Sequence, residues 1–256
     1  MLSLSKVKYL KSLHQKKYRR REKKVLLEGF RLIEQALQAE GKVEEVWMST
    51  RAVKSEPGKQ LQSLLQTKSI PLSKTTDPLI RQVSDSKNDQ GIIALAAIPQ
   101  YENLTKTPSQ ALYLDGISDP GNLGTLLRTA AWFGVQAVYI SPDSVDPFNS
   151  KVIRSAMGAQ FYFSILDATR GEEKLKNLSG TSTAIIGGDH RGKSLDNLAT
   201  SKFENWVLVL GSEAWGIRKS VEKFLTHKVS IPGSEGMESL NVSVAGGIIL
   251  NTLIFG

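Results

Sequence analysis

Residues 118–129 read SDPGNLGTLLRT, a proline-glycine turn that leads directly into an apolar segment with one arginine. The apolar run ALYLDGI at 111–117 comes just before the turn and is typical of a strand. A strand that enters a helix through a glycine-rich turn is the repeating unit of α/β folds, whose ligands bind at the carboxyl ends of the strands. The stretch therefore predicts an α/β fold with a candidate site at this turn. Helical spacing predicts one buried helix face, made by Leu123, Leu127, Ala130 and Gly134.

The turn alone is open to two interpretations. It contains neither a Gly-Lys-Ser/Thr sequence nor a G-x-G-x-x-G fingerprint, which disfavours a simple nucleotide-phosphate site. Backbone N–H groups at the start of a helix can still bind an anion or a polar ligand. The plainer interpretation makes residues 120–121 a turn, Asn122 the helix cap and Gly124 a packing residue. Arg128 lies off the buried face, where it meets either solvent or a phosphate at the edge of the sheet.

The chain is predicted to fold as two domains joined by a linker. Residues 1–98 read as a basic arm at 1–24 followed by a small α/β unit at 25–98. PQYENLTKTPSQ, which starts at residue 99, is polar, aperiodic and contains two prolines, so residues 99–109 are the predicted linker. From 110 to 256 apolar strands alternate with helical patterns, which implies a mostly parallel sheet covered by helices on both faces.

The positive charge of the chain is concentrated at its start. The formal net charge is +8, yet residues 1–24 carry ten Lys or Arg and one acid, a net of +9, and the other 232 residues carry 23 basic and 24 acidic side chains. Such a block neutralises phosphates and favours a nucleic-acid partner. A solvated basic helix or a membrane-surface segment is the alternative.

Other kinds of site find no support in the composition. The chain has no cysteine, which excludes disulfides and thiolate metal sites and fits a reducing cytoplasm. His14, His190 and His227 lack the spacing of metal ligands, so no metal site is expected. No stretch approaches the roughly 20 apolar residues of a membrane span, and the first 24 residues lack the apolar core of a secretory signal. We therefore expect a cytoplasmic protein without a membrane partner.

Three further stretches carry polar residues beside predicted strand or helix ends. LVLGSEAWGI at 208–217 places a glycine, a serine and a carboxylate directly after a strand, and IPGSEGMESLNVSVA at 231–245 leads a second strand into a small-residue helix. FNSKVIRSAMGA at 148–159 predicts a helix with Lys151 and Arg154 on one face, either solvated or in contact with phosphates. Helix capping explains Ser239 or Asn241 singly, but not two such loops at one sheet edge.

Together these motifs resemble the SpoU/TrmH family of RNA 2′-O-ribose methyltransferases, within the SPOUT class. DPGNLGTLLRTA is similar to the first family motif, LVLGSEAWGI to the second and IPGSEGMESLNVSVA to the third, in the same order and spacing. The resemblance covers residues 108–256. The N-terminal block, with SKVKYLKSLHQKKYRR and VLLEGFRLIEQAL, is similar to the ribosomal-protein-L30e-like substrate-binding domain of rRNA-directed members.

The resemblance implies a fold, a cofactor and an assembly. The catalytic domain, residues 110–256, is expected to be an α/β knot, with a deep trefoil in a mostly parallel sheet, and residues 1–98 to be the smaller RNA substrate-binding domain. S-adenosyl-L-methionine is expected in the knot, and the family works as a homodimer. The cofactor-binding residues that it implies are Leu210, Gly211, Ile231, Ser239 and Leu240.

The resemblance also implies roles for the polar side chains. Arg128 is the expected catalytic arginine beside the ribose 2′-hydroxyl. Because a guanidinium stays protonated in proteins, we interpret Arg128 as orienting the nucleotide and stabilising the developing alkoxide, and the residues do not identify the proton acceptor. The other expected catalytic residues are Asn122, Glu213, Ser239 and Asn241. The expected RNA-binding residues are Lys16, Lys17, Arg19, Arg20, Arg21, Lys151 and Arg154.

The predicted activity is methylation of a ribose 2′-hydroxyl in RNA, with 23S ribosomal RNA as the expected substrate. Transfer RNA is the alternative substrate, because the cations of the basic arm bind RNA phosphates and do not recognise a nucleotide sequence. A non-catalytic RNA-binding or ribosome-assembly factor is the alternative class of protein. The modified nucleotide does not follow from these residues.

Overall fold

The computed structural model describes residues 2–39, 41–86, 88–99, 108–167, 171–197, 203–234 and 239–256. It divides into two compact units, each described here by itself. The first contains Met1–Gln100 and Asp146–Tyr162, and the second contains Tyr101–Val145 and Phe163–Gly256. The segment 146–162 thus packs with the first unit although it lies within the sequence predicted for the second domain. Most of the predicted linker, residues 100–107, lies outside the described residues.

The first unit is a four-stranded sheet with helices on both faces. The strand order is β1-β4-β2-β3, in which β4 runs antiparallel to β1 and β2, and β3 parallel to β2. The strands are β1 (Lys24–Glu28), β2 (Val43–Ser49), β3 (Leu72–Thr75) and β4 (Ile92–Ala97). The helices are α1 (Leu4–Ser12), α2 (Lys16–Glu22), α3 (Phe30–Gln38), α4 (Thr50–Lys54), α5 (Glu56–Thr67), α6 (Asp77–Val83), α8 (Ser150–Ala156) and the short 3-10 turn η1 (Ala159–Phe161).

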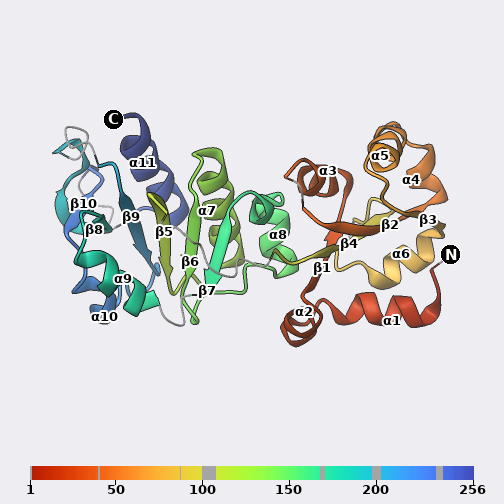
Figure 1. The fold of residues 1–256 in the computed structure, drawn as a ribbon, viewed down its shortest axis with the longest axis horizontal. Coiled ribbons are helices and arrows are strands. Elements are labelled where there is room, and N and C mark those ends of the chain that lie inside the picture. The colour runs from red at the N-terminus through yellow and green to blue at the C-terminus, as the bar shows by residue number, and fades with distance from the viewer. Residues whose placement is uncertain are drawn as a thin grey trace. The chain divides into compact units, whose positions relative to one another are not determined.

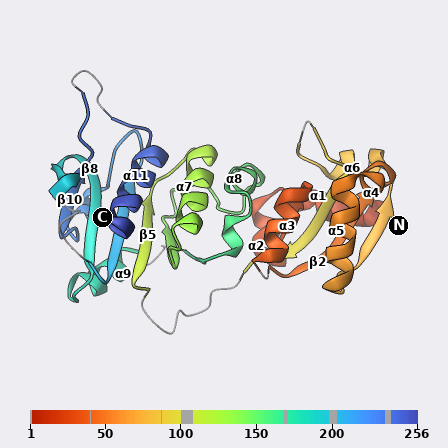
Figure 2. The ribbon, with the colours of Figure 1, turned by 90° about the horizontal axis from the view of Figure 1, so that it is seen from above.

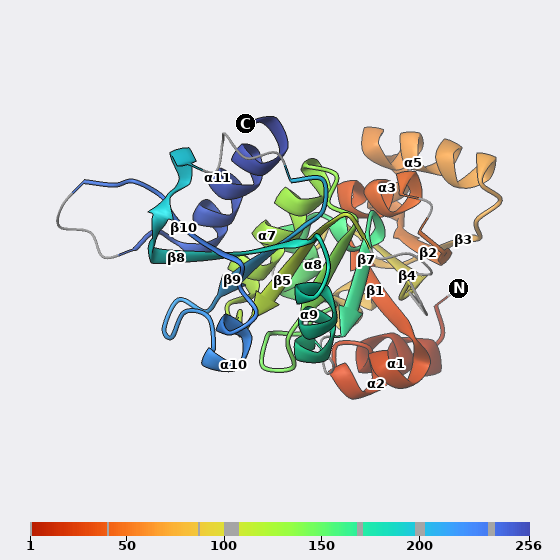
Figure 3. The same cartoon turned by 60° about the vertical axis from the view of Figure 1, so that its left-hand side comes forward.

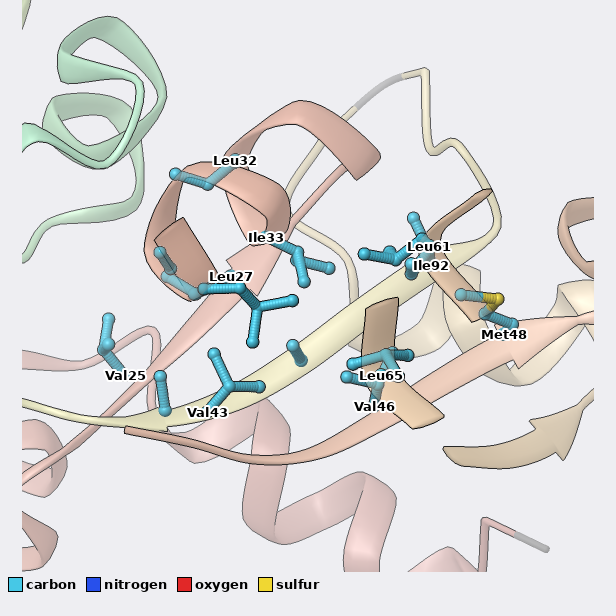
Figure 4. Close-up of a cluster of buried hydrophobic side chains, with 14 of the residues drawn as sticks. Val25, Leu27, Leu32, Ile33, Val43, Val46, Met48, Leu61, Leu65 and Ile92 are labelled. Carbon is cyan, nitrogen blue, oxygen red and sulfur yellow. The ribbon is translucent and has the colours of Figure 1, made fainter. Parts of the chain in front are cut away.

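Two apolar cores fill the faces of this sheet. On one face α3 and α5 lie side by side (Figures 1 and 2) and bury Ile33, Leu61 and Leu65 against the strands (Figure 4). On the opposite face α1 and α6 bury Leu10 and Ile80. The alternation of side chains along each strand supplies both faces, which is why the central strand β4 is apolar at every position.

The basic arm is part of this fold. Its residues form α1 and α2, and Val7, Leu10 and Leu13 are buried. Arg19 is only 3% exposed: its Nη1 donates to the carbonyl oxygens of Leu13 at 2.8 Å and His14 at 2.7 Å, and its Nη2 pairs with Asp146. The expectation that Arg19 contacts RNA is therefore corrected, because its guanidinium is used to fix α2.

The second unit is a six-stranded, wholly parallel sheet. Its order is β10-β8-β9-β5-β6-β7. Figure 3 shows α7 and α11 on one face of the sheet and α9 and α10 on the other. The strands are β5 (Gln110–Asp115), β6 (Ala137–Ile140), β7 (Ser164–Asp167), β8 (Ala184–Ser194), β9 (Trp206–Gly211) and β10 (His227–Ser230). The helices are α7 (Pro120–Trp132), α9 (Gly171–Ser179), α10 (Lys219–Glu222), α11 (Val242–Phe255) and the 3-10 turn η3 (Leu195–Asn197).

Helix α7 lies alongside α11, and the two run parallel. Their first turns are joined by a side-chain hydrogen bond from Asn241 to Asn122, and at their other ends the rings of Phe133 and Phe255 lie 6.0 Å apart between centroids. The close approach needs Gly246, where a Cβ atom would lie 2.6 Å from a Leu126 methyl. This packing fixes the starts of both helices at the same edge of the sheet.

Two details of the second unit differ from expectation. Leu123, Leu127 and Ala130 are buried as predicted, but Gly134 is exposed with φ +71° because α7 has already ended. Strand β8 is longer than its apolar part, AIIGG at 184–188, and continues through polar residues to Ser194. No helix among the described residues is both long and apolar enough to span a bilayer. The threading of the chain that a trefoil knot requires stays a prediction.

Candidate active site

The first turn of α7 lies beside the two loops predicted to join it. Asn122 Nδ2 donates a hydrogen bond to the Glu213 carboxylate, and Asn122 Oδ1 accepts one of 2.8 Å from Asn241 Nδ2. One amide thus joins side chains 91 and 119 residues away in sequence. The three loops meet because β5 and β9 are adjacent parallel strands and α11 packs on α7. We call Asn122, Glu213 and Asn241 the polar cluster.

Asn122 is available for these bonds because another residue caps α7. The N-cap is Asp119, whose Oδ1 accepts from the Asn122 backbone N–H at 2.8 Å. The interpretation of Asn122 as the helix cap was wrong. A carboxylate one turn earlier satisfies the free N–H group and also suits the positive end of the helix dipole.

Asn241 serves both as a cap and as a member of the polar cluster. Its Oδ1 accepts from the Ser243 backbone N–H at 2.9 Å and the Ser243 hydroxyl at 2.6 Å, which caps α11. Its Nδ2 then points to Asn122. Because the oxygen is used by the helix, the amide has one orientation, and that orientation sets the hydrogen-bond direction through the cluster.

A closed turn presents Glu213. Ser212 and Gly216 exchange backbone hydrogen bonds of 3.2 and 2.9 Å, and the Ser212 hydroxyl accepts from the Trp215 N–H at 3.1 Å. Gly211 begins the turn, where a Cβ atom would lie 2.1 Å from the carbonyl carbon of Gly216. Only glycine fits there, so the turn has a fixed shape and holds Glu213 at its exposed tip.

An ion pair with a buried carboxylate anchors the far side of this turn. Asp115, at the end of β5, has a fully buried carboxylate that accepts from the Arg218 backbone at 2.9 Å and from Arg218 Nε at 2.8 Å. The Asp115 hydrogen bond raises the pKa of Arg218. Burial raises the pKa of the neighbouring Tyr113 hydroxyl to about 12, and the Asp115 charge adds to that rise. The bonds between Asp115 and Arg218 hold the turn against β5.

Two expected catalytic residues stand outside these contacts. Arg128 is exposed on α7, and within the part of the chain that the structure describes it forms no hydrogen bond or ion pair. Ser239 is exposed two residues before Asn241 and likewise has no partner among the described side chains. The structure therefore brings three of the five expected catalytic side chains together and leaves Arg128 and Ser239 free to meet a ligand.

The expected cofactor residues lie at the end of β9, after β10 and before α11. Leu210 and Gly211 are buried at the end of β9, Ile231 is half-buried after β10, and Leu240 is 50% exposed before α11. Among the described residues the backbone of Ile231 and of Leu240 forms no hydrogen bond. Apolar side chains beside unused backbone groups suit a planar heterocycle that needs both stacking and hydrogen bonds.

The remaining RNA-binding candidates belong to the first unit. Lys151 is exposed on α8, whereas Arg154 is half-buried and its Nη1 is buried without a hydrogen-bond partner in the described part of the chain. The cations of α2 lie around Tyr18, with Lys17 Nζ 4.8 Å from the ring centroid and the Arg21 guanidinium 5.0 Å from it. The α2 residues that are exposed, and so able to meet phosphates, are Lys16, Lys17, Arg20 and Arg21.

Comparison with known proteins identifies the family. The SpoU rRNA Methylase family model matches residues 109–251, which is more than half of the chain. The chain belongs to the SpoU rRNA methylase family. It is accordingly an RNA methyltransferase, and the polar cluster lies within the matched region. A second model, the MRM3-like substrate binding domain, matches residues 5–94.

Relatives of this methylase match along nearly the whole chain. It is 31% identical over 249 residues to the 23S rRNA (guanosine(2553)-2′-O)-methyltransferase RlmP of Bacillus subtilis, covering 96% of this chain and 94% of that protein. It is also 31% identical to a tRNA/rRNA methyltransferase of Synechocystis, covering 95% and 88%. The solved structure of a TrmH-family RNA methyltransferase from Porphyromonas gingivalis aligns with a TM-score of 0.84 at 28% identity, covering 99% of this chain and 98% of that one.

Sequence reasoning missed the residues that support the second motif of this methylase. Asp115 and Arg218 lie just outside the motifs, and only the buried carboxylate shows that they form a pair. The signal for Asp115 was an acid at the end of an otherwise apolar strand, which is unusual unless it is paired. Trp215 was quoted within LVLGSEAWGI without a role, although an aromatic residue at the tip of a glycine-bounded loop is a signal for ligand contact.

Proposed function

We propose that the protein transfers a methyl group from S-adenosylmethionine to the 2′-hydroxyl of a ribose in 23S ribosomal RNA. The observation that carries the proposal is the hydrogen-bonded polar cluster, which joins all three SpoU motifs at one edge of the sheet. The Bacillus subtilis relative, which spans the same two regions, is named for this reaction on a guanosine of 23S rRNA. The match of residues 5–94 to a substrate-binding domain supports a separate RNA-binding role for the first unit.

The residues at the ends of β9 and β10 suit S-adenosylmethionine. The half-exposed side chains of Ile231 and Leu240 offer apolar contact to an adenine ring, and their free backbone groups offer the hydrogen bonds. When bound, S-adenosylmethionine supplies an electrophilic methyl group on a sulfonium. The Glu213 carboxylate, held by Asn122 at the same edge of the sheet, would offer a negatively charged acceptor to the bound group.

The side chains of the site would act on the ribose by positioning and by charge. Methyl transfer to oxygen requires the acceptor to lie in line with the methyl group, and a rigid site contributes by holding the two atoms in that geometry. Arg128, which has no described partner, can donate hydrogen bonds to the ribose oxygen as its negative charge develops. The polar cluster holds together the three loops that carry its members.

If the methyl acceptor is a ribose 2′-hydroxyl, removal of that hydroxyl is expected to abolish methylation. With labelled S-adenosylmethionine the purified protein is expected to label a 23S rRNA fragment but not the same sequence with a 2′-deoxy residue at the target, because the acceptor oxygen is missing. Mapping 2′-O-methyl sites in ribosomal and transfer RNA from cells with and without the gene identifies the target. Label on the deoxy substrate excludes the ribose as acceptor, and a lost site in tRNA alone excludes 23S rRNA.

We further propose that the methylase is a homodimer joined through α11 and the end of α7. Val244, Ile248 and Phe255 are spaced four and seven residues apart, so they share one face of α11, and all are exposed. Trp132, 85% exposed at the end of the adjacent α7, extends the same kind of surface. An apolar helix face rimmed by aromatic rings is typical of an interface between copies.

Val244→Asp is expected to make the protein monomeric. An acid at this position, in the first turn of α11, is favourable to the helix dipole, so the change disfavours the interface without weakening the helix. Val244→Thr, which keeps the branched shape, is the control and is expected to stay dimeric. Light scattering after gel filtration reports the mass, and a dimeric Val244→Asp protein contradicts the proposed interface.

A further inference from the structure

The most exposed large apolar side chain in the described chain is Trp215, at 89%. It lies at the tip of the turn that presents Glu213, two residues further along. The turn is closed at its base by the Ser212–Gly216 backbone pair, and the Trp215 N–H is held by the Ser212 hydroxyl at 3.1 Å. The indole is therefore displayed by a fixed turn, and no packing within the described residues accounts for its position.

Its place relative to the polar cluster follows from the chain itself. Glu213 bonds to Asn122, and two residues span at most about 7 Å of backbone. The indole thus extends from the rim of the polar cluster, on the same unit and the same turn. Within this turn the three residues between Ser212 and Gly216 contribute no other aromatic group.

The chemistry of the proposed reaction calls for such a group. A ribose can be held for in-line transfer only if its nucleotide is held too, and RNA that is read in loops and single strands offers unstacked bases to aromatic side chains. Stacking on an indole is sequence-tolerant because every base has a flat face. The side chains of the polar cluster provide no apolar surface on which a base could stack.

We propose that Trp215 is a positioning residue that stacks on the nucleobase of the RNA at the methylation site. The inference rests on the proposed function and adds to it a contact with the base. It assigns to the second SpoU motif of this chain an RNA-binding surface in addition to its carboxylate. Stacking of this kind changes affinity by about 5- to 100-fold when the ring is removed.

The test compares three replacements of one side chain. Trp215→Leu keeps an apolar side chain without a ring, and Trp215→Phe and Trp215→Tyr keep a ring. For Trp215→Leu we expect the KM for a 23S rRNA fragment to rise by about 5- to 100-fold. The affinity for S-adenosylmethionine, measured by calorimetry, and the mass of the protein stay unchanged, and the two aromatic variants recover most of the RNA affinity.

A fluorescence measurement tests the contact without catalysis. Of the four tryptophans, Trp47 and Trp206 are buried. Trp132→Phe, which keeps an apolar ring on the proposed dimer surface, leaves Trp215 as the exposed emitter. Adding the RNA fragment is expected to quench this emission, and a fragment with an abasic target nucleotide is expected not to do so. Equal quenching by both fragments overturns the assignment to the target base.

The outcomes separate this inference from the proposed function. If the unaltered protein methylates the ribose and Trp215→Leu binds RNA equally well, the stacking role is wrong and the function stands. A loss of cofactor affinity places the indole against S-adenosylmethionine, and a change of mass places it in the dimer interface; either result overturns the proposal. If the unaltered protein methylates no ribose, the proposed function fails, and quenching still decides whether Trp215 contacts a base.

Discussion

Arg128→Ala is expected to lower methyl transfer by at least about 10²- to 10³-fold while the affinity for S-adenosylmethionine stays within a factor of two. A donor aimed at developing charge on oxygen contributes on this scale to catalysis. The side chain is exposed and forms no hydrogen bond or ion pair with a described residue, so its removal should leave the fold intact. Single-turnover rates measure the transfer step, and calorimetry measures the cofactor affinity.

Two variants show whether charge or geometry is lost. Arg128→Lys keeps the positive charge but loses the planar fork, so we expect an intermediate rate. Lys176→Ala removes an exposed cation from α9, on the other face of the sheet, and is expected to transfer at the normal rate. If Arg128→Ala loses cofactor binding, Arg128 belongs to the cofactor site and not to the methyl-transfer step. A full rate in Arg128→Ala removes it from the site altogether.

The sequence predicted the α/β class well because its signals are local. The apolar run ALYLDGI predicted β5, and the apolar start of LVLGSEAWGI predicted the end of β9. Partners distant in sequence are not visible in such patterns. A helix in the basic arm was given only as a solvated alternative, and its packing was missed because lysines and arginines dominate the composition, while a few residues such as Leu10 provide the burial. Arg19 was misassigned for the same reason, since only its contact with Asp146 shows that it is structural.

The grouping of the three loops was predictable from the sequence, but the hydrogen bonds that join them were not. Motif order placed Asn122, Glu213 and Asn241 at one sheet edge, and the structure joins them by hydrogen bonds. Which side chain caps α7 depends on whether the helix begins at Pro120 or three residues later, a difference that periodicity does not resolve. The pairing of Asp115 with Arg218 required the register of the sheet.

Asn122→Asp is expected to lower kcat/KM by about 10²-fold at pH 8, a misplacement effect of the size seen when a positioning group fails. The change is isosteric, and the Oδ1 that accepts from Asn241 remains. The donor to Glu213 is replaced by a second carboxylate, so attraction between the first and second motifs becomes repulsion. The turn that presents Glu213 should then move away from α7.

The pH dependence of this variant identifies the cause. Two adjacent carboxylates raise the pKa of one of them, because both charges together are unfavourable. As the pH falls towards about 5, one carboxyl group takes up a proton and can donate again, so the ratio of variant to unaltered activity should rise. Activity profiles of both proteins from pH 5 to 9 measure this ratio. A ratio that is constant with pH contradicts repulsion as the cause.

A neighbouring substitution separates positioning from folding. Asp119→Ala removes the cap of α7 and should lower the free energy of unfolding by about 0.5–2 kcal/mol, measured by urea denaturation, while the Asn122 side-chain bonds persist. Asn122→Asp keeps the cap and should show the opposite pattern, a loss of activity with little loss of stability. The two residues lie three apart on one helix start, so opposite patterns assign the cap to the fold and the Asn122 amide to the reaction. If both variants lose stability and activity in proportion, the polar cluster acts only as packing, and its place in the chemistry must be given up.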